Sequence, residues 1–323
     1  MTYRTLTAVN TQVSEFCFGT MRYADKDGTE NQRSANGARA LETAIEKGVN
    51  FIHSSYEYKT RWLTGPVLKR NPRRHELHHI IKVNVPEFEE PRFNVDSFRR
   101  QIEQALEELG TERIEVVQHL QRGVPRSEMM TPATDKYRLE QFDEIEGEIA
   151  EIAGKMKQEG KIGTVMSFPY TVAFARRVVE SPVYSGLVAY FNPLETEMVE
   201  FFDRLEELGK DYITIRPLCQ GILTDKRADR KSLPAEDRMK SPNMDDLYRR
   251  FETVRRALGE PGMPWEQFAF RFSLIHPVIK SSVLGITVPE HLKTAEGPDL
   301  VSGDLLAKAL QANQEFDVIG QRD

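Results

Sequence analysis

Three residues whose side chains can hold or move a proton follow short apolar runs along the chain. Tyr58 comes after the run at residues 49–52, Lys82 ends a run that includes Ile80, and His119 ends the run at residues 114–118. If these runs are parallel strands, the three side chains lie at the carboxyl-end rim, where barrel enzymes keep their catalytic groups. A phenol beside an ammonium and an imidazole can donate a proton to a carbonyl oxygen that gains negative charge when hydride attacks its carbon. We therefore expect a proton-donating site.

The elements that must position these side chains follow one repeated pattern. A helix, a glycine and a short apolar strand recur with helices at residues 35–47, 95–109, 145–158 and 197–208 and strands at residues 49–52, 114–118, 162–166 and 212–215. This alternation is typical of a parallel α/β protein. The repetition has no break in composition, and no strand is followed by Gly-x-Gly-x-x-Gly, the fingerprint of a doubly wound dinucleotide fold. The pattern predicts an α/β protein in which residues 1–323 form a single (β/α)8 barrel domain.

Two polar segments interrupt this pattern. Residues 121–141 follow the strand that ends near His119, and residues 225–246 follow the strand that precedes Arg216. Long insertions after barrel strands lie over the active face, so both segments are candidate loops that shape substrate access. A solvated surface loop explains either segment equally well.

Composition excludes several classes of partner. The chain has 323 residues with 39% hydrophobic and 29% charged residues, a net charge of −6 and a pI near 5.8. An acidic chain of this kind favours a small-molecule substrate over nucleic acid or an anionic membrane surface. We expect a cytoplasmic protein, because the N-terminal residues lack the apolar core of a signal peptide and Cys17 and Cys219 lie in apolar contexts typical of reduced core thiols. Composition leaves the oligomeric state open.

Residues 75–79 match the zinc-protease pattern His-Glu-x-x-His. That site needs both histidines one turn apart on a helix. Here the segment stands between Asn71-Pro72 and a predicted strand, which is a poor place for a helix. We therefore expect surface or strand-edge histidines and no metal site.

The chain resembles the aldo-keto reductase family over nearly its whole length. The resemblance is carried by motifs that occur in the family's order: residues 3–6 (YRTL), 13–14 (VS), 18–21 (FGTM), 48–52 (GVNFI), 105–110 (ALEELG), 160–163 (GKIG) and 217–224 (PLCQGILT). It implies a (β/α)8 barrel that reduces a carbonyl compound with NADPH or NADH. It also implies that Tyr58 is the general acid and that Lys82 and His119 assist it.

The resemblance also assigns nucleotide binding to three parts of the chain. These are the end of the first barrel strand, the segment after residue 215 and the segment after residue 284. The residues implied are Gly19, Thr20, Met21, Arg216, Pro217, Leu218, Gln220, Gly221, Gly285, Thr287 and His291.

Several positions depart from the family pattern. His53 stands where the family has a strand-end aspartate that balances the lysine charge. We include His53 in the catalytic set and expect that it stays neutral or that Lys82 loses its proton more readily, because two neighbouring cations disfavour each other. Glu57 restores the missing charge if its side chain turns inward.

The nucleotide contacts depart further. The polar and aromatic contacts to the nicotinamide are replaced by Phe168-Pro169, Val188 and Ile215, and the phosphate and adenine anchors by Gly285, Ile286, His291 and Ala295. We expect weaker nucleotide binding than is usual in the family, by roughly a hundredfold if two charged hydrogen bonds are lost.

Three interpretations stay open at this point. The first is an NAD(P)H-dependent reductase of a small aldehyde, ketone or sugar, with Tyr58 as the proton donor. The second is a cofactor-independent isomerase, epimerase or lyase in which Arg216 binds an anionic group, although a surface salt bridge explains a lone arginine equally well. The third is a non-catalytic binding subunit of the same fold.

Overall fold

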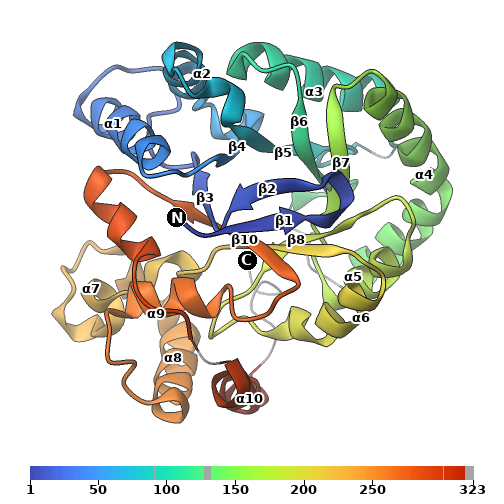
Figure 1. Ribbon diagram of the computed structural model, residues 1–323. Helices are drawn as coiled ribbons and strands as arrows, with labels where there is room; N and C mark the ends of the chain where they lie inside the picture. Colours follow the sequence, from blue (N-terminus) through green and yellow to red (C-terminus); the bar gives the residue numbers. More distant parts are fainter. Residues whose placement is uncertain (91, 127–131, 301, 317–323) are drawn as a thin grey trace.

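The computed structural model describes residues 1–90, 92–126, 132–300 and 302–316. Its centre is a closed barrel of parallel strands in the order β10-β3-β4-β5-β6-β7-β8-β9 (Figure 1). The strands are β3 (Phe16–Gly19), β4 (Phe51–Ser55), β5 (His78–Asn84), β6 (Ile114–Leu120), β7 (Ile162–Ser167), β8 (Gly186–Tyr190), β9 (Asp211–Ile215) and β10 (Ile279–Gly285). The predicted (β/α)8 barrel is confirmed.

A hairpin of β1 (Tyr3–Leu6) and β2 (Thr11–Ser14) crosses one end of the barrel (Figure 1). Leu6 and Val13 from this hairpin are buried and belong to the same apolar cluster as residues of the barrel interior. The hairpin therefore closes the amino-terminal end of the strands and leaves the carboxyl-terminal end as the mouth.

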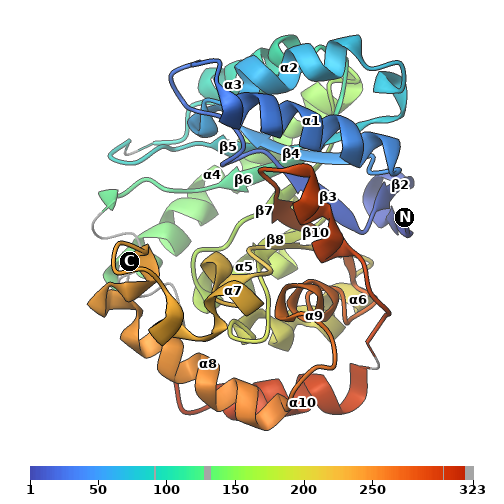
Figure 2. The ribbon, with the colours of Figure 1, turned by 90° about the vertical axis from the view of Figure 1, so that its left-hand side faces the viewer.

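Helices surround the barrel (Figures 1 and 2). They are α1 (Gln32–Glu46), α2 (Arg61–Arg70), α3 (Val95–Leu109), α4 (Pro132–Gln158), α5 (Val172–Glu180), α6 (Phe202–Glu207), α7 (Asp225–Ala228), α8 (Asp245–Leu258), α9 (Trp265–Phe272) and α10 (Ser302–Asn313). In both views α8 and α10 lie side by side outside the ring of the other helices. No helix in the described part of the chain is both long and apolar enough to cross a membrane.

The helix α3 shows why the predicted pattern works. The Asn94 side chain accepts a hydrogen bond from the Ser97 backbone N–H at 2.8 Å and caps the amino terminus. Gly110 ends the helix with a φ of 68°, a left-handed conformation that favours glycine. Between these caps Phe98, Ile102 and Ala105 are buried at helical spacing. The helix predicted at residues 95–109 is confirmed.

The segments at residues 121–141 and 225–246 differ from the expected loops. Residues 127–131 lie outside the described part, but α4 begins at Pro132, so residues 132–141 are helical rather than loop. Proline suits the first turn of a helix because its missing N–H would be unpaired there. Residues 225–246 contain α7, three short 3-10 turns and the start of α8.

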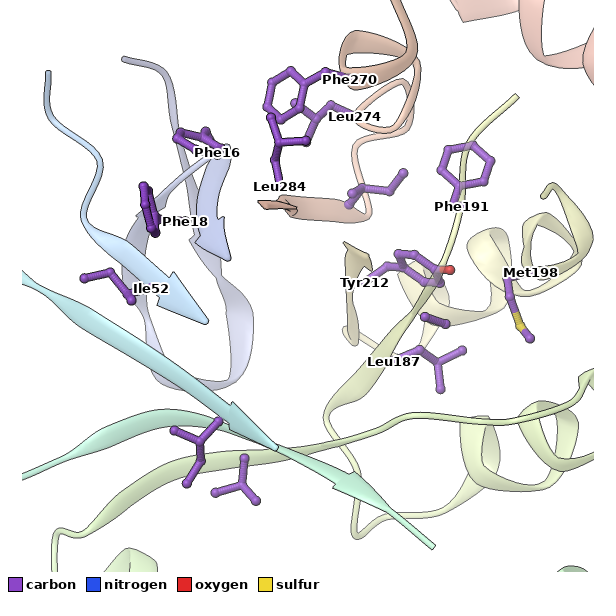
Figure 3. Close-up of a cluster of buried hydrophobic side chains, with 14 of the residues drawn as sticks. Phe16, Phe18, Ile52, Leu187, Phe191, Met198, Tyr212, Phe270, Leu274 and Leu284 are labelled. Atoms are coloured by element: carbon purple, nitrogen blue, oxygen red, sulfur yellow. The ribbon is translucent and has the colours of Figure 1, made fainter. Parts of the chain in front are cut away.

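Alternate residues of each strand face two different cores. On β3, Phe16 and Phe18 belong to the cluster between strands and helices, whereas Cys17 belongs to the cluster inside the barrel. Figure 3 shows Phe16 and Phe18 with Phe270, which lies on α9, in the outer cluster. This alternation follows from the two-residue period of a strand, and it decides which side chains reach the mouth.

Candidate active site

Tyr58 and Lys82 lie together at the mouth of the barrel. Tyr58 is the last residue of the 3-10 turn η2 (Tyr56–Tyr58), which directly follows β4 and begins with the Ser55 hydroxyl accepting from the Glu57 backbone N–H. Lys82 lies near the end of β5, and its Nζ is 5.1 Å from the centroid of the Tyr58 ring. Tyr58 is 7% exposed and Lys82 is partly exposed. The structure thus brings together the predicted phenol and ammonium.

His53 lies next to Tyr58 and Lys82. It lies on β4, it is buried, and its ring centroid is 5.7 Å from that of Tyr58. Its Nε2 is 2.9 Å from the Gln118 Oε1, so the imidazole donates a hydrogen bond to the amide oxygen. Burial and the nearby Lys82 charge lower the pKa of His53 to about 3. His53 is therefore a neutral donor at physiological pH.

Lys82 keeps its proton. Burial acts to lower the pKa of this ammonium, but its interactions with Tyr58, and then with Tyr190 and Tyr170, raise the pKa above its usual value. Of the two outcomes that the sequence left open, the structure supports a neutral His53 beside a charged Lys82. Lys82 can therefore stabilise negative charge on an oxygen near Tyr58.

Glu57 is turned toward a different cation. Its carboxylate accepts two hydrogen bonds from Arg122, at 2.6 Å and 2.9 Å. Arg122 also donates from Nε to the Tyr170 hydroxyl at 2.9 Å. Burial disfavours the Glu57 charge, but Arg122 and then Lys82 hold the pKa of this carboxyl below its usual value. The ion pair ties the turn that carries Tyr58 to the segment after β6.

The expectation that His119 converges with Tyr58 and Lys82 is not met. The His119 Nδ1 is 2.7 Å from the Tyr184 hydroxyl, and its Nε2 donates to the Val85 carbonyl oxygen at 2.6 Å. Its ring packs against Phe98 and Tyr184 in the layer between strands and helices. Burial lowers the pKa of His119 to about 4, so the ring is neutral. Both ring nitrogens are used in the outer core, away from the mouth.

Strand alternation explains this placement. On β6, Val116 and Leu120 belong to the inner cluster and Val117 to the outer one. The inward polar residue is therefore Gln118, which pairs in register with Lys82. Sequence reasoning missed Gln118, although the parity of the strand was a usable signal for it. The Nε2 of Gln118 is buried and has no hydrogen-bond partner among the described residues.

The wall next to this group is apolar. Phe168, Val188 and Ile215 are 5%, 0% and 8% exposed and belong to the cluster inside the barrel. The Phe168 ring contacts Tyr170 at 4.9 Å and Tyr190 at 5.4 Å between centroids. These side chains fill the positions at which the resemblance implies polar and aromatic contacts to a nicotinamide. These side chains can make apolar contact with a planar ring, but they cannot form hydrogen bonds with an amide group.

Arg216 faces inward, as the sequence allowed, but it has a partner. Its Nη2 lies 2.8 Å from the Glu195 Oε1, and its guanidinium stacks 4.6 Å from the Tyr190 ring centroid. Glu195 is 1% exposed. Burial lowers the pKa of Arg216, but the Glu195 charge outweighs that effect and raises it, so the guanidinium is charged. Burial raises the pKa of the Glu195 carboxyl, and the Arg216 charge acts against that rise. Neither alternative from the sequence holds in full, because the ion pair is buried rather than on the surface.

The predicted nucleotide residues form a rim on one side of the mouth. Gly19 ends β3 beside Gly285, the last residue of β10, and the Thr20 hydroxyl donates to the His53 carbonyl oxygen at 3.1 Å. Met21 is 48% exposed. Thr287 is half-buried and His291 is exposed, and their Oγ1 and Nδ1 atoms lie 3.2 Å apart. Nothing lies within 4 Å of a Cβ built on Gly285, so the surface there is open.

The turn that follows Arg216 carries positive charge. Pro217 and Leu218 lead into the 3-10 turn η6 (Cys219–Gly221), in which Gln220 and Gly221 have φ values of 62° and 92°. Arg238 donates hydrogen bonds to both the side-chain and backbone oxygens of Gln220. Burial, followed by the charges of Arg22 and Arg227, lowers the pKa of Arg238, and the Asp237 charge opposes this effect. Asp237 also lies 3.3 Å from Arg227.

No group of three or more potential metal ligands occurs within the residues that the structure describes. His75 lies in the 3-10 turn η3 (Arg74–Glu76), whereas His78 and His79 lie on β5. As expected from the sequence, the His-Glu-x-x-His segment therefore does not form a single helix.

A parallel (β/α)8 barrel with a phenol, an ammonium and a neutral imidazole at its mouth has the arrangement of a barrel enzyme that transfers protons. The chain belongs to the aldo/keto reductase family, whose family model matches residues 15–295. This membership supports oxidoreductase activity on carbonyl substrates. No curated protein matches this chain.

Solved structures agree on the fold. The holo form of the aldo-keto reductase AKR11C1 from Bacillus halodurans is similar with a TM-score of 0.69 and 18% identity over 100% of both chains. The glycerol dehydrogenase AKR11B4 from Gluconobacter oxydans gives a TM-score of 0.69 and 19% identity over 98% of this chain and 97% of that chain. At these identities the likeness establishes the barrel alone.

Proposed function

We propose that this protein reduces a small carbonyl compound with Tyr58 as the proton donor and a nicotinamide nucleotide, NADPH or NADH, as the hydride source. The observation that carries the proposal is the contact between Tyr58 and the protonated Lys82 at the mouth, 5.1 Å from ring centroid to Nζ. Family membership supports the reaction class, and the position of Lys82 beside the Tyr58 ring supports Tyr58 as the acid.

The rim fits the phosphate end of such a nucleotide. Gln220 and Gly221 would present the turn to the phosphates, with Arg227 and Arg238 beside it. Thr287 and His291 stand at the far side, where Gly285 leaves room. Clustered guanidinium groups favour phosphate oxygens. The bound nucleotide would supply hydride to the carbonyl carbon, and Phe168 and Ile215 would pack against its ring.

Lys82 and Tyr58 act on the carbonyl oxygen. When the carbonyl carbon gains hydride, its oxygen becomes negative, and the Tyr58 hydroxyl donates its proton to that oxygen. The Lys82 ammonium stabilises the phenolate that Tyr58 becomes, because an opposite charge nearby favours the ionised form. His53 does not compete for this role, since its imidazole stays neutral and donates to Gln118.

The test is the rate of carbonyl-dependent NADPH or NADH oxidation by the wild type and by Tyr58→Phe. We expect Tyr58→Phe to lose about 10²–10⁴-fold in kcat, the usual contribution of a general acid. Tyr56→Phe is a matched control, because Tyr56 is in the same turn but contacts Asn84 instead of Lys82. Full activity in Tyr58→Phe would refute the assigned proton donor.

One observation favours a second candidate function. Phe168 and Val188 stand where the resemblance implies polar side chains that hold the nicotinamide amide, and Ile215 stands where it implies a stacking aromatic. A site that binds no nucleotide would use Tyr58 and Lys82 for proton abstraction and return, as in an isomerase or epimerase. Calorimetric titration with NADPH and NADH separates the two functions, because the first requires binding, weaker than is usual for the family, and the second requires none.

A further inference from the structure

The substitution at His53 changes the charge of the site. His53 is neutral, because burial and Lys82 prevent its protonation above about pH 3. An aspartate at this position would carry one negative charge. The groups next to Tyr58 are therefore the uncharged His53 imidazole and the uncharged Gln118 amide, whose Nε2 and Oε1 atoms lie 2.9 Å apart.

Two carboxylates near the mouth, Glu57 and Glu195, each pair with an arginine. Glu57 accepts both hydrogen bonds from Arg122, at 2.6 Å and 2.9 Å. Glu195 lies 2.8 Å from Arg216 and also accepts a hydrogen bond from Asn192. Lys82 also acts on the Glu57 carboxyl, but Arg122 acts on it more strongly, so neither carboxylate is left without an arginine partner beside Lys82.

Lys82 has no carboxylate partner of its own within the described residues. After burial, the groups that act most strongly on its charge are the hydroxyls of Tyr58, Tyr190 and Tyr170. Its Nζ lies over the face of Tyr58, which favours a cation without neutralising it. The Tyr58 site thus carries about one uncompensated positive charge, and a partly buried cation of this kind gains most from an anionic ligand.

We propose that the substrate is a small 2-oxo acid whose carboxylate pairs with Lys82 while its carbonyl oxygen meets the Tyr58 hydroxyl. This inference rests on the proposed function. The carbonyl and carboxylate oxygens of a 2-oxo acid are neighbours, so one molecule reaches both groups across the Tyr58–Lys82 contact. The carbonyl carbon takes up hydride with its electron pair, supplied by the reduced nicotinamide, and the oxygen takes the Tyr58 proton. The product is the 2-hydroxy acid, the nicotinamide leaves oxidised, and water reprotonates Tyr58.

Calorimetric titration of the full chain with oxamate and with oxamide tests the proposal. Oxamate is an anionic, unreactive relative of a 2-oxo acid, and oxamide is its neutral match. We expect oxamate to bind at least about tenfold more tightly, the factor that corresponds to one charge-assisted hydrogen bond. Equal binding of the two probes, or binding of neither, would overturn the proposal.

Two variants test whether the preference for oxamate depends on the charge of the side chain at position 53. His53→Asp restores a carboxylate near Lys82 and should abolish most of the preference for oxamate, whereas His53→Asn keeps the position neutral and should retain it. Where His53→Asp does not fold, Lys82→Gln removes the same positive charge and should have the same effect. A preference that survives loss of the Lys82 charge contradicts the inference.

Turnover separates this inference from the proposed function. Glyoxylate and glycolaldehyde are a matched acidic and neutral pair of aldehydes, and NADPH and NADH oxidation is followed with each. Oxamate selectivity without turnover of either aldehyde would leave the anion site standing and refute the reductase. Turnover that favours glycolaldehyde would support the reductase and refute the 2-oxo acid.

Discussion

Replacing His119 with phenylalanine tests whether the structure or the family pattern describes this residue correctly. The imidazole makes two buried hydrogen bonds, one with the Tyr184 hydroxyl at 2.7 Å and one to the Val85 carbonyl at 2.6 Å. Phenylalanine keeps an aromatic ring against Phe98 and Tyr184 but leaves both polar groups unpaired. An unpaired buried polar group costs about 1–3 kcal/mol, so the two together should destabilise the fold by roughly 2–6 kcal/mol.

The assay has a thermodynamic and a kinetic arm. Urea unfolding of His119→Phe measures the lost free energy, which is a large fraction of a typical total of about 5–15 kcal/mol. Tyr184→Phe is the matched control, because it removes one of the two hydrogen bonds and should cost less than the histidine variant. The kcat of the folded fraction should stay within about threefold of the wild type, since His119 does not face the mouth. A variant with unchanged stability and a hundredfold loss of kcat would refute the placement of His119.

Two further predictions concern the ion pair at the mouth and the response to acid. Arg122→Leu removes both hydrogen bonds to Glu57 and frees the turn that carries Tyr58, so kcat should fall by about tenfold with KM less affected. The control is Arg126→Leu, because the Arg126 guanidinium lies farther from the same Phe88 ring, and this variant should leave kcat unchanged. Equal effects of the two variants on kcat would contradict this role of Arg122. Unfolding free energy should fall as pH drops from about 6.5 toward 4, because burial lowers the pKa of His53 to about 3 and of His79 and His119 to about 4, so the unfolded chain takes up protons that the native state excludes. At pH 5 each histidine should cost about 2 kcal/mol relative to pH 8, and a His79→Phe variant with unchanged acid sensitivity would argue against this origin.

The sequence predicted elements best where local chemistry decides the boundary. The helix at residues 95–109 is confirmed to the residue, because Asn94 and Gly110 are caps whose effect does not depend on the rest of the fold. The strand at residues 49–52 was placed too early. In the structure β4 runs from Phe51 to Ser55, and its polar end is buried by pairing with β5. Such pairing is a tertiary effect that an apolar run cannot reveal.

The same distinction separates the site residues. Tyr58 and Lys82 come together as expected, because the turn after β4 and the end of β5 lie at the same rim. The partners of the charged groups were not predictable from local pattern, since Arg216 pairs with Glu195 and Glu57 pairs with Arg122, a residue 65 positions away. Those pairs depend on which loops meet above the barrel.

His119 shows that a position near the end of a strand does not determine the direction of a side chain. Successive residues of β6 alternate between two cores, so one residue of displacement moves a side chain from the mouth to the helix layer. Gln118 occupies the inward position and receives a hydrogen bond from His53, which keeps the imidazole in one tautomer. Because burial and Lys82 hold the pKa of His53 near 3 while that of Lys82 is raised, neither group changes charge between about pH 5 and 9. The site therefore presents one fixed positive charge across that range, which is the condition that selective binding of an anionic carbonyl compound requires.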